Sequence, residues 1–564
     1  PDNQTVDYTW ETGGLLQNVR YPEGGNWSTS ERWWNLPTTT LYPGGTTQTQ
    51  SWDAFGRIAS QQAKTAGQVT IQQRTYTYDL ENNPLKIDSE RGQHQYQYDA
   101  LYRLTEALHP AGLPTERFML DGVGNRLTDE SKPNPAEAGN RWKYNANHQL
   151  EQAATENTAL FGSNAQPVTH SWDDAGNLIR KQTPPGTESL HPYQNQRYQY
   201  DAQNRLTETQ DQSGNAIASY QYDPYGRRIR KTVYREWNGS WQLRLEAKTR
   251  YYLYGDEGLV AEYEQLGNGT PELMAQYGWE PGGLWGTSPL WMQAKRSDTG
   301  ATERYHYLND HLGTPQQLID AQGQVVWSQL QTAFGETKVD NTSVVTNPLR
   351  FPGQYYDEET QTHYNFFRDY DPQTGRYVQS DPIGLEGGIN TYAYVSGSPT
   401  AYIDMLGLME CWWLDLGNVP TCKRTGVKRQ KSTNTYETFQ WFPAPDPQSP
   451  SIPLPPSAGP PKPGLKIVWR TVFREQGYWE EEFKCKVFMA YVCNDCGKIT
   501  KNGGNKDLDD KWEKIIGSEY DEATGYGKWS SSGAPSGPWD LETDSGGPPG
   551  SRPVRRPILN SSFR

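Results

Sequence analysis

One short phrase recurs eight times in the first part of this 564-residue chain. Each copy has an aromatic or apolar residue followed by Asp or Asn, then a turn-like segment that leads to Leu or Ile. The second residues of the copies are Asp53, Asp79, Asp99, Asp121, Asn145, Asp173, Asp201 and Asp223. Successive copies therefore lie 20 to 28 residues apart. Imperfect repetition at such a period predicts a stack of structural repeats.

Each repeat has the pattern of a β-hairpin. Segments 96–98 and 220–222 both read Tyr-Gln-Tyr, and this alternation predicts strands with one aromatic face. The following Asp can open a turn by accepting hydrogen bonds from backbone N–H groups two residues on, with Gly or Asn where positive φ is needed. Because one hairpin cannot bury its face alone, the units must stack on their neighbours. We therefore interpret these Tyr and Asp residues as scaffold, without a catalytic role.

Composition fits a β-rich chain and excludes several functions. Hydrophobic residues make up only 34%, but aromatics reach 12%, with 36 Tyr and 21 Trp, which argues against disorder. The net charge of −14 argues against a protein that coats nucleic acid or binds an anionic membrane surface. The acidic excess (−16) lies entirely before residue 409, and the tail carries +2. The longest apolar run, 487–493, is too short to span a bilayer.

The repeats resemble the YD repeats of the Rhs (rearrangement hotspot) and Tc-toxin C-component family over about residues 1–408. The resemblance implies an all-β fold in which a β-sheet strip spirals into a hollow shell, and the shell would enclose a toxic C-terminal domain until delivery. The expected domains are a YD-repeat shell at 1–300, an Rhs-associated core at 301–408 and a variable effector domain at 409–564.

Two denser blocks, 306–320 and 349–408, resemble the Rhs-associated core signature along its whole length. The family ends this core with Pro-x-x-x-x-Asp-Pro-x-Gly-Leu and cuts its own chain after the Leu. The matching residues here are Pro399, Asp404, Gly407 and Leu408. The resemblance therefore implies a scissile bond between Leu408 and Met409.

Asp381 and Asp404 suit the chemistry of such a cut. They are 23 residues apart, which is enough for a strand, a turn and a return strand that bring both carboxylates together. Two close carboxyls tend to share a proton, so that one activates water while the other protonates the carbonyl or the leaving amine. The resemblance assigns both residues to an aspartyl-protease-like site and adds Arg368, whose charge would bias the pair or polarise the carbonyl. This intramolecular reaction needs no cofactor.

Local alternatives exist for each of these residues. Asp before Pro is a common turn opener, as in Asp381-Pro382, and either Asp381 or Asp404 could be a plain turn cap. Arg368 fits equally a surface ion pair with its neighbours Asp369 or Asp371. Met405 stands where the family usually has Pro, and a less rigid backbone there would slow or loosen positioning of the scissile bond.

The tail, 409–564, has a different composition. It holds all five cysteines and no histidine, and ten of its residues from 443 to 463 are Pro, which predicts an extended linker. Segments 465–473 and 481–493 alternate like strands, and 506–520 predicts a short helix. We therefore expect a separate α+β or irregular domain.

The effector reactions open to a tail without histidine include two for which it has candidate residues. A carboxylate-metal nuclease could draw its ligands from Asp507, Asp509, Asp510 and the three Glu residues at 480–482. Arg470, Ser530 to Ser532 and Glu542 have the order of an NAD-dependent ADP-ribosyltransferase, although Asp544 occupies the position where a second Glu would be expected. Cys485, Cys493 and Cys496 are weak candidates for a zinc site, with free thiols or disulfides as the alternative.

These features predict an Rhs-type toxin fragment, in which a β-shell encapsulates an effector released by autocleavage. The expected partners are the chain's own C-terminal fragment, a cognate immunity protein, and secretion-machinery or chaperone proteins. The protein would be secreted and delivered into a target cell during interbacterial competition, without spanning a membrane. The alternative is a secreted YD-repeat adhesion or carbohydrate-binding protein with an inert tail. Block 349–408, which an adhesin does not need, favours the toxin.

Overall fold

The structure, a computed structural model, describes residues 5–11, 14–128, 142–154, 167–186 and 192–408, together with the strands of the tail. The chain divides into two compact units, one of Pro1–Gly417 with Tyr491–Thr500 and one of Asn418–Ala490 with Lys501–Arg564. Within the described ranges, no helix has the length and apolar character needed to cross a membrane.

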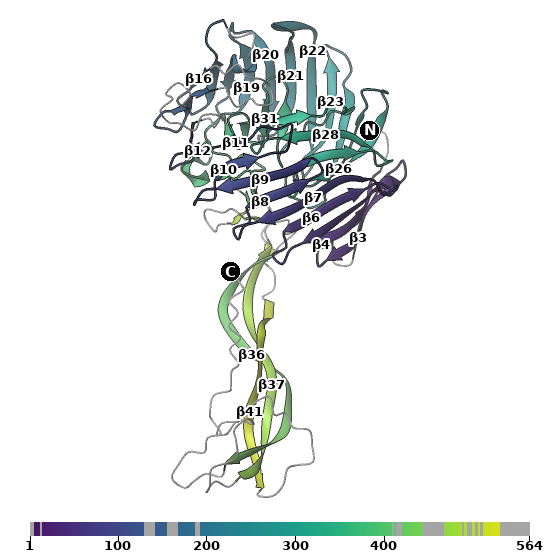
Figure 1. The fold of residues 1–564 in the computed structure, drawn as a ribbon, viewed down its shortest axis with the longest axis vertical. Coiled ribbons are helices and arrows are strands. Elements are labelled where there is room, and N and C mark those ends of the chain that lie inside the picture. Colours follow the sequence, from purple (N-terminus) through teal and green to yellow (C-terminus); the bar gives the residue numbers. More distant parts are fainter. Residues whose placement is uncertain are drawn as a thin grey trace. The chain divides into compact units, whose positions relative to one another are not determined.

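The first unit is built on two large antiparallel sheets whose strands follow one another in chain order (Figure 1). The first sheet has 11 strands: β1 (Asp7–Trp10), β2 (Leu16–Arg20), β3 (Asn26–Trp33), β4 (Leu36–Leu41), β5 (Thr47–Trp52), β6 (Ile58–Lys64), β7 (Thr70–Tyr78), β8 (Pro84–Ser89), β9 (Gly92–Tyr98), β10 (Leu104–Leu108) and β11 (Glu116–Arg117). A two-stranded ribbon of β12 (Met119–Leu120) and β13 (Arg126–Thr128) follows.

The second sheet continues the same arrangement. Its 16 strands are β14 (Lys143–Tyr144), β15 (Leu150–Ala154), β16 (Pro167–Trp172), β17 (Leu178–Gln182), β18 (Gln196–Tyr200), β19 (Leu206–Asp211), β20 (Ala216–Tyr222), β21 (Arg228–Trp237), β22 (Trp241–Tyr254), β23 (Leu259–Leu266), β24 (Glu272–Trp279), β25 (Pro289–Lys295), β26 (Thr302–Asn309), β27 (Pro315–Ile319), β28 (Val325–Gln331) and β29 (Thr337–Val339). Residue 300 does not interrupt this sheet, because β25 and β26 pair across it.

The repeated Asp residues close the hairpin turns as expected. Asp53 Oδ1 accepts hydrogen bonds from the backbone N–H groups of Phe55 (2.9 Å) and Arg57 (3.0 Å). The Arg57 side chain then returns to Asp53 Oδ2 at 2.7 Å. The same Asp-to-Arg arrangement recurs at Asp99, Asp201 and Asp223. Each turn therefore satisfies its own backbone within five residues.

The strip curls so that its beginning packs against its later strands. Val19 in β2 and Tyr42, directly after β4, share one buried apolar cluster with Trp291, Leu308 and Ile319 of the second sheet. Burial of such large side chains is the main favourable contribution to folding. The predicted all-β repeat strip is confirmed.

A smaller sheet follows the strip and carries most of the residues discussed below. It contains β30 (Tyr355–Asp357), β31 (Thr362–Asn365), β32 (Arg368–Asp371) and β33 (Arg376–Tyr377), while β34 (Tyr402–Ile403) pairs with β35 (Cys411–Trp412). The described ranges of the first unit also contain four short 3-10 turns: η1 (Pro43–Gly45), η2 (Pro192–Gln194), η3 (Gly384–Gly387) and η4 (Val395–Gly397).

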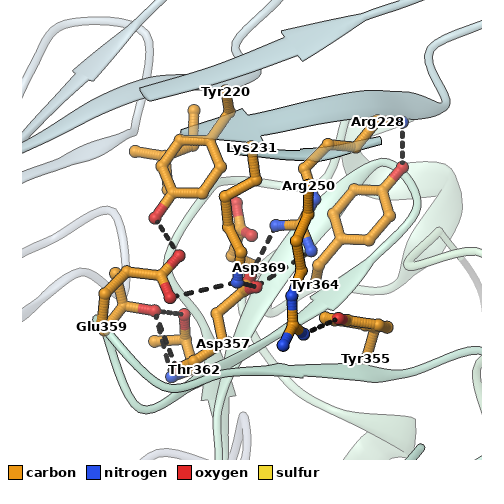
Figure 2. Close-up of polar contacts among 12 residues, drawn as sticks. Tyr220, Arg228, Lys231, Arg250, Tyr355, Asp357, Glu359, Thr362, Tyr364 and Asp369 are labelled. Atoms are coloured by element: carbon orange, nitrogen blue, oxygen red, sulfur yellow. Dashed lines mark hydrogen bonds and ion pairs between the residues drawn. The ribbon is translucent and has the colours of Figure 1, made fainter. Parts of the chain in front are cut away.

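A buried charge cluster joins this small sheet to the strip (Figure 2). Arg228, from β21, binds both oxygens of Asp357 in β30, at 2.5 and 3.0 Å. Lys231 reaches Asp357 at 2.7 Å and Glu359 at 3.1 Å, and the Tyr220 hydroxyl donates to Glu359 at 2.8 Å. All five side chains are buried. We call Arg228, Lys231, Asp357 and Glu359 the clamp, in which two cations balance two carboxylates.

The described part of the tail consists of strands. Besides β35, they are β36 (Pro420–Pro443), β37 (Ile467–Val487), β38 (Ala490–Val492), β39 (Ile499–Lys501), β40 (Lys506–Asp507) and β41 (Lys511–Ser530). β36 and β41 both pair with β37, and the three form the long ribbon of Figure 1. The helix predicted for 506–520 is therefore wrong, because β40 and β41 hydrogen-bond to β37 and pairing overrides the local helix preference. Most of the predicted Pro-rich linker lies outside the described residues.

Candidate functional site

Arg368 stands at the centre of a buried group of carboxylates. Its Nη2 atom lies 2.9 Å from Asp381 Oδ2 and 3.3 Å from Asp404 Oδ2. All three side chains are at most 4% exposed. The structure thus places the three predicted site residues together, although they come from β32, from the loop after β33 and from the residue after β34.

Arg368 is held from several sides. Its Nε donates to the carbonyl of Gly407 at 2.5 Å, and its Nη1 donates to the carbonyl of Thr391 at 3.0 Å. The guanidinium also lies over the ring of Tyr377, 3.6 Å from the centroid. A planar cation fixed in this way presents one nitrogen to both aspartates.

The surface ion-pair interpretation of Arg368 is wrong. Asp371 pairs with Lys181 at 2.6 Å, and Asp369 accepts a hydrogen bond from Gln379 at 2.6 Å. In an antiparallel strand successive side chains point to opposite faces, so Arg368 is directed away from its neighbour Asp369. All of these groups are buried.

Asp404 fixes the chain segment that precedes the predicted scissile bond. Its Oδ1 accepts hydrogen bonds from the N–H groups of Leu406 (3.3 Å), Gly407 (2.8 Å) and Leu408 (3.1 Å). Asn365 donates to the Asp404 carbonyl at 2.7 Å. Gly407 adopts φ 69°, and a Cβ there would lie 2.5 Å from the Asn365 carbonyl oxygen, which explains the glycine.

Asp381 uses its two oxygens in a similar way. Oδ1 accepts the Ile383 N–H at 3.0 Å and closes a turn, while Oδ2 contacts Arg368. Asp404 likewise closes a turn through Oδ1 and binds Arg368 through Oδ2. Each aspartate is therefore both a turn cap, through Oδ1, and a member of the buried carboxylate group, through Oδ2.

The Asp381 and Asp404 carboxyls differ in the hydrogen-bond donors that surround them. Burial raises the pKa of Asp381 to about 6, although Arg368 opposes the rise. Burial also raises the pKa of Asp404, against the charge of Arg368, the Tyr377 hydroxyl and the backbone N–H groups. In the described part of the chain no direct hydrogen bond joins the two carboxyls, and Arg368 links them. Asp381 can therefore gain or lose a proton in mildly acidic or near-neutral solution.

Tyr377 is a site residue that the sequence did not reveal. Its hydroxyl donates to Asp404 Oδ2 at 2.7 Å, and Asn365 donates to that hydroxyl at 2.8 Å. Burial and the Asp404 charge raise the pKa of Tyr377, so the phenol stays a neutral donor. Nothing in the sequence distinguishes it from the other 35 tyrosines.

Of the two methionines near the predicted cut, the structure describes only Met405. Met405 is buried, and its backbone packs tightly on Gly353, where a Cβ would lie 2.3 Å from the Met405 carbonyl oxygen. Whether Met405 slows cleavage stays a prediction. Met409, on the far side of the scissile bond, lies outside the described residues.

The structure describes only some of the candidate ligand and catalytic residues of the tail. Arg470, Cys485 and the Glu residues at 480–482 lie in β37, Asp507 ends β40 and Ser530 ends β41. Asp509, Asp510, Ser531, Ser532, Glu542, Asp544, Cys493 and Cys496 lie outside the described residues. The predicted metal and NAD sites therefore stay predictions.

Two family models match parts of the chain. The model described as RHS protein matches residues 305–340, and the model described as RHS Repeat matches residues 172–216. The first match runs from within β26 to the end of β29, and the second runs from the end of β16 into β20. Both therefore fall on the second large sheet.

Several curated proteins are similar to this chain. The double-stranded DNA deaminase toxin A of Burkholderia cenocepacia is 31% identical over 398 residues, which cover 65% of this chain and 25% of the relative. The probable deoxyribonuclease RhsB of Dickeya dadantii is 29% identical (71% and 25% covered), and toxin protein Tse5 of Pseudomonas aeruginosa is 29% identical (64% and 29% covered). The chain thus spans less than a third of the length of these relatives. Among solved structures, the TcdB2-TccC3-Cdc42 crystal structure matches with a TM-score of 0.49 and 17% identity, covering 72% of this chain and 22% of that one.

Proposed function

Because this chain belongs to the Rhs repeat family, we propose that it is the C-terminal part of a secreted toxin that cuts itself between Leu408 and Met409. One observation carries the proposal. Asp381, Asp404 and Arg368 are buried together against the segment that ends at Leu408. The substrate is thereby held at the site by the chain itself, and such tethering supplies much of the rate of an intramolecular reaction.

The proposed reaction is hydrolysis by one water molecule from solvent. A carboxylate removes a proton as the water oxygen bonds to the Leu408 carbonyl carbon. The C–N bond then breaks, and the Met409 nitrogen takes up a proton. The products are a new carboxylate on Leu408 and a new amino terminus on Met409.

The contacts divide the work between the two aspartates. Asp381, with a pKa of about 6 and one backbone donor, is the group that exchanges the proton. Asp404 holds the substrate segment through three N–H groups and shares Arg368 with Asp381. Arg368 stabilises negative charge near the Gly407 carbonyl, which it already contacts.

The direct test follows the wild-type chain after folding. The chain is recovered unfolded, diluted into folding buffer and sampled over time on denaturing gels and by mass spectrometry. We expect two fragments, 1–408 and 409–564, that still co-elute in native size exclusion because the strip retains the tail. A wild-type chain that folds and stays whole would overturn self-cleavage, and a free tail fragment would overturn retention by the strip.

Tyr377→Phe tests the environment of Asp404. The substitution removes one hydrogen bond to a charged acceptor, worth about 1.5–3 kcal/mol, so cleavage should slow by about 10- to 100-fold. The same time course measures it. Tyr200→Phe is the matched control, because the Tyr200 hydroxyl donates to the Leu178 carbonyl, outside the group around Arg368. Equal rates for both variants would remove Tyr377 from the site.

The released tail is proposed to be the toxic effector. The similar proteins carry deaminase, deoxyribonuclease and toxin names, and for this chain a carboxylate-metal nuclease and an ADP-ribosyltransferase are the two reactions to test. Expression of the full chain in bacteria, followed by examination of DNA integrity and NAD-dependent protein labelling, separates them. An immunity protein and secretion or chaperone proteins are the proposed partners, and a target cell is the proposed destination.

A further inference from the structure

Gly387 lies between the two reacting parts of the proposed site. It is the last residue of η3, the short turn that follows Asp381. Its backbone φ is not positive, so the residue lies outside the left-handed region. An L-amino acid could therefore adopt the backbone conformation of Gly387, and the glycine needs another explanation.

A side chain at this position would meet the reacting groups themselves. A Cβ built on Gly387 would lie 2.4 Å from Asp381 Oδ2 and 2.8 Å from the carbonyl oxygen of Leu408. Both distances are too short for a real contact. Because both distances are measured from the same point, the two oxygens are separated by no more than their sum.

Neither oxygen can move aside freely. Asp381 Oδ2 is paired with Arg368 at 2.9 Å, and Asp381 Oδ1 is held by the Ile383 N–H. The Leu408 oxygen is backbone, and the N–H of the same residue is bound by Asp404 at 3.1 Å. A methyl group at 387 would therefore have to displace a fixed carboxylate, a fixed carbonyl, or both.

We propose that Gly387 is a positioning residue for self-cleavage, whose missing side chain lets the Asp381 carboxyl approach the carbonyl group of the Leu408–Met409 bond. The inference rests on the proposed function. It assigns the hydrolytic water to the space shared by Asp381 Oδ2 and the Leu408 carbonyl, where Asp381 removes its proton as the new C–O bond forms. The electron pair of the broken C–N bond stays on the Met409 nitrogen, which gains a proton.

Gly387→Ala tests the proposal in the full chain. Displacing a reacting group by about 1 Å costs on the order of 100-fold in rate, so we expect cleavage at least about 100-fold slower than in the wild type. Gly122→Ala is the matched control, because a Cβ there has no atom within 4 Å and its backbone also lies outside the left-handed region. The control should cleave at the wild-type rate. Wild-type cleavage in Gly387→Ala would overturn the proposal.

Two further measurements separate positioning from damage to the fold. The circular dichroism of Gly387→Ala should match that of Gly122→Ala, and loss of fold would overturn the local role proposed here. The pH at which residual cleavage is half-maximal should move upward, because a methyl group that pushes Asp381 from Arg368 weakens what stabilises its charge. A slower rate with an unmoved pH midpoint would indicate a structural effect only and would also overturn the proposal.

The outcome is distinguishable from failure of the proposed function. If the wild type stays whole, self-cleavage itself fails and Gly387 has no reaction to position. If the wild type cleaves, Asp381→Asn does not, and Gly387→Ala does, only the present inference fails.

Discussion

Asp381→Asn is expected to leave the chain as one 564-residue band under conditions in which the wild type gives two fragments. Asn has nearly the same shape and keeps an oxygen that can accept the Ile383 N–H, so the turn survives. It cannot take a proton from water, and loss of a general acid–base group costs about 10²- to 10⁴-fold. The gel time course and the masses of the products measure the effect.

Asp404→Asn should give the same single band for a related reason. The amide oxygen can still hold the N–H groups of residues 406–408, but one of the two carboxylates that bind Arg368 is gone. Asp211→Asn is the control, since Asp211 closes an exposed turn of the same kind through the N–H groups of Ser213 and Asn215. Cleavage of Asp381→Asn at the control rate would contradict the assigned role.

Asp357→Ala is expected to cause the largest loss of stability. It removes the carboxylate that Arg228 and Lys231 share and leaves two buried cations with too few partners. Breaking a buried ion pair from one side typically costs about 3–5 kcal/mol. Urea unfolding followed by tryptophan fluorescence should show the loss, and Lys86→Ala, which breaks an exposed pair with Asp88, should leave the midpoint unchanged.

The pKa of Asp357 decides at which pH the urea unfolding should be measured. Burial alone would raise the pKa of Asp357, but Arg228 and Lys231 hold it below its ordinary value. A lowered folded-state pKa gives stability that is complete above the unfolded pKa of about 3.9 and is lost as pH falls through the folded value. The clamp therefore contributes fully to stability at pH 7.

Cleavage should also slow in Asp357→Ala, because β30 belongs to the sheet that carries Arg368 and Tyr377.

The repeat strip was predictable because its signals are local. One hairpin contains both signals: the alternation of aromatic and polar residues, and an Asp that accepts hydrogen bonds from two backbone N–H groups further along. Asp53 is an example. The positions of Asp381 and Asp404 were found only through a family signature, since spacing alone does not separate a turn cap from a buried carboxylate. At both positions the structure shows each aspartate bonding a turn and Arg368 at once.

The remaining site features depend on contacts between distant residues. Arg228 and Asp357 are 129 residues apart, and no pattern near either one indicates the other. Gly387 resembles any loop glycine until the carbonyl of Leu408 is placed beside it. The predicted helix at 506–520 failed for the same reason, because β37, which pairs with that stretch, lies elsewhere in the sequence.

The self-contained turns have a consequence for how such a protein can change over evolutionary time. Because each Asp-capped hairpin satisfies its own turn and pairs only with the strands on either side, a unit can be duplicated or deleted without redesigning the others. The length of the strip then depends on the number of repeats. A gene that gains or loses hairpins would add strands to the sheet or remove them, while the chemistry of each repeat stays the same.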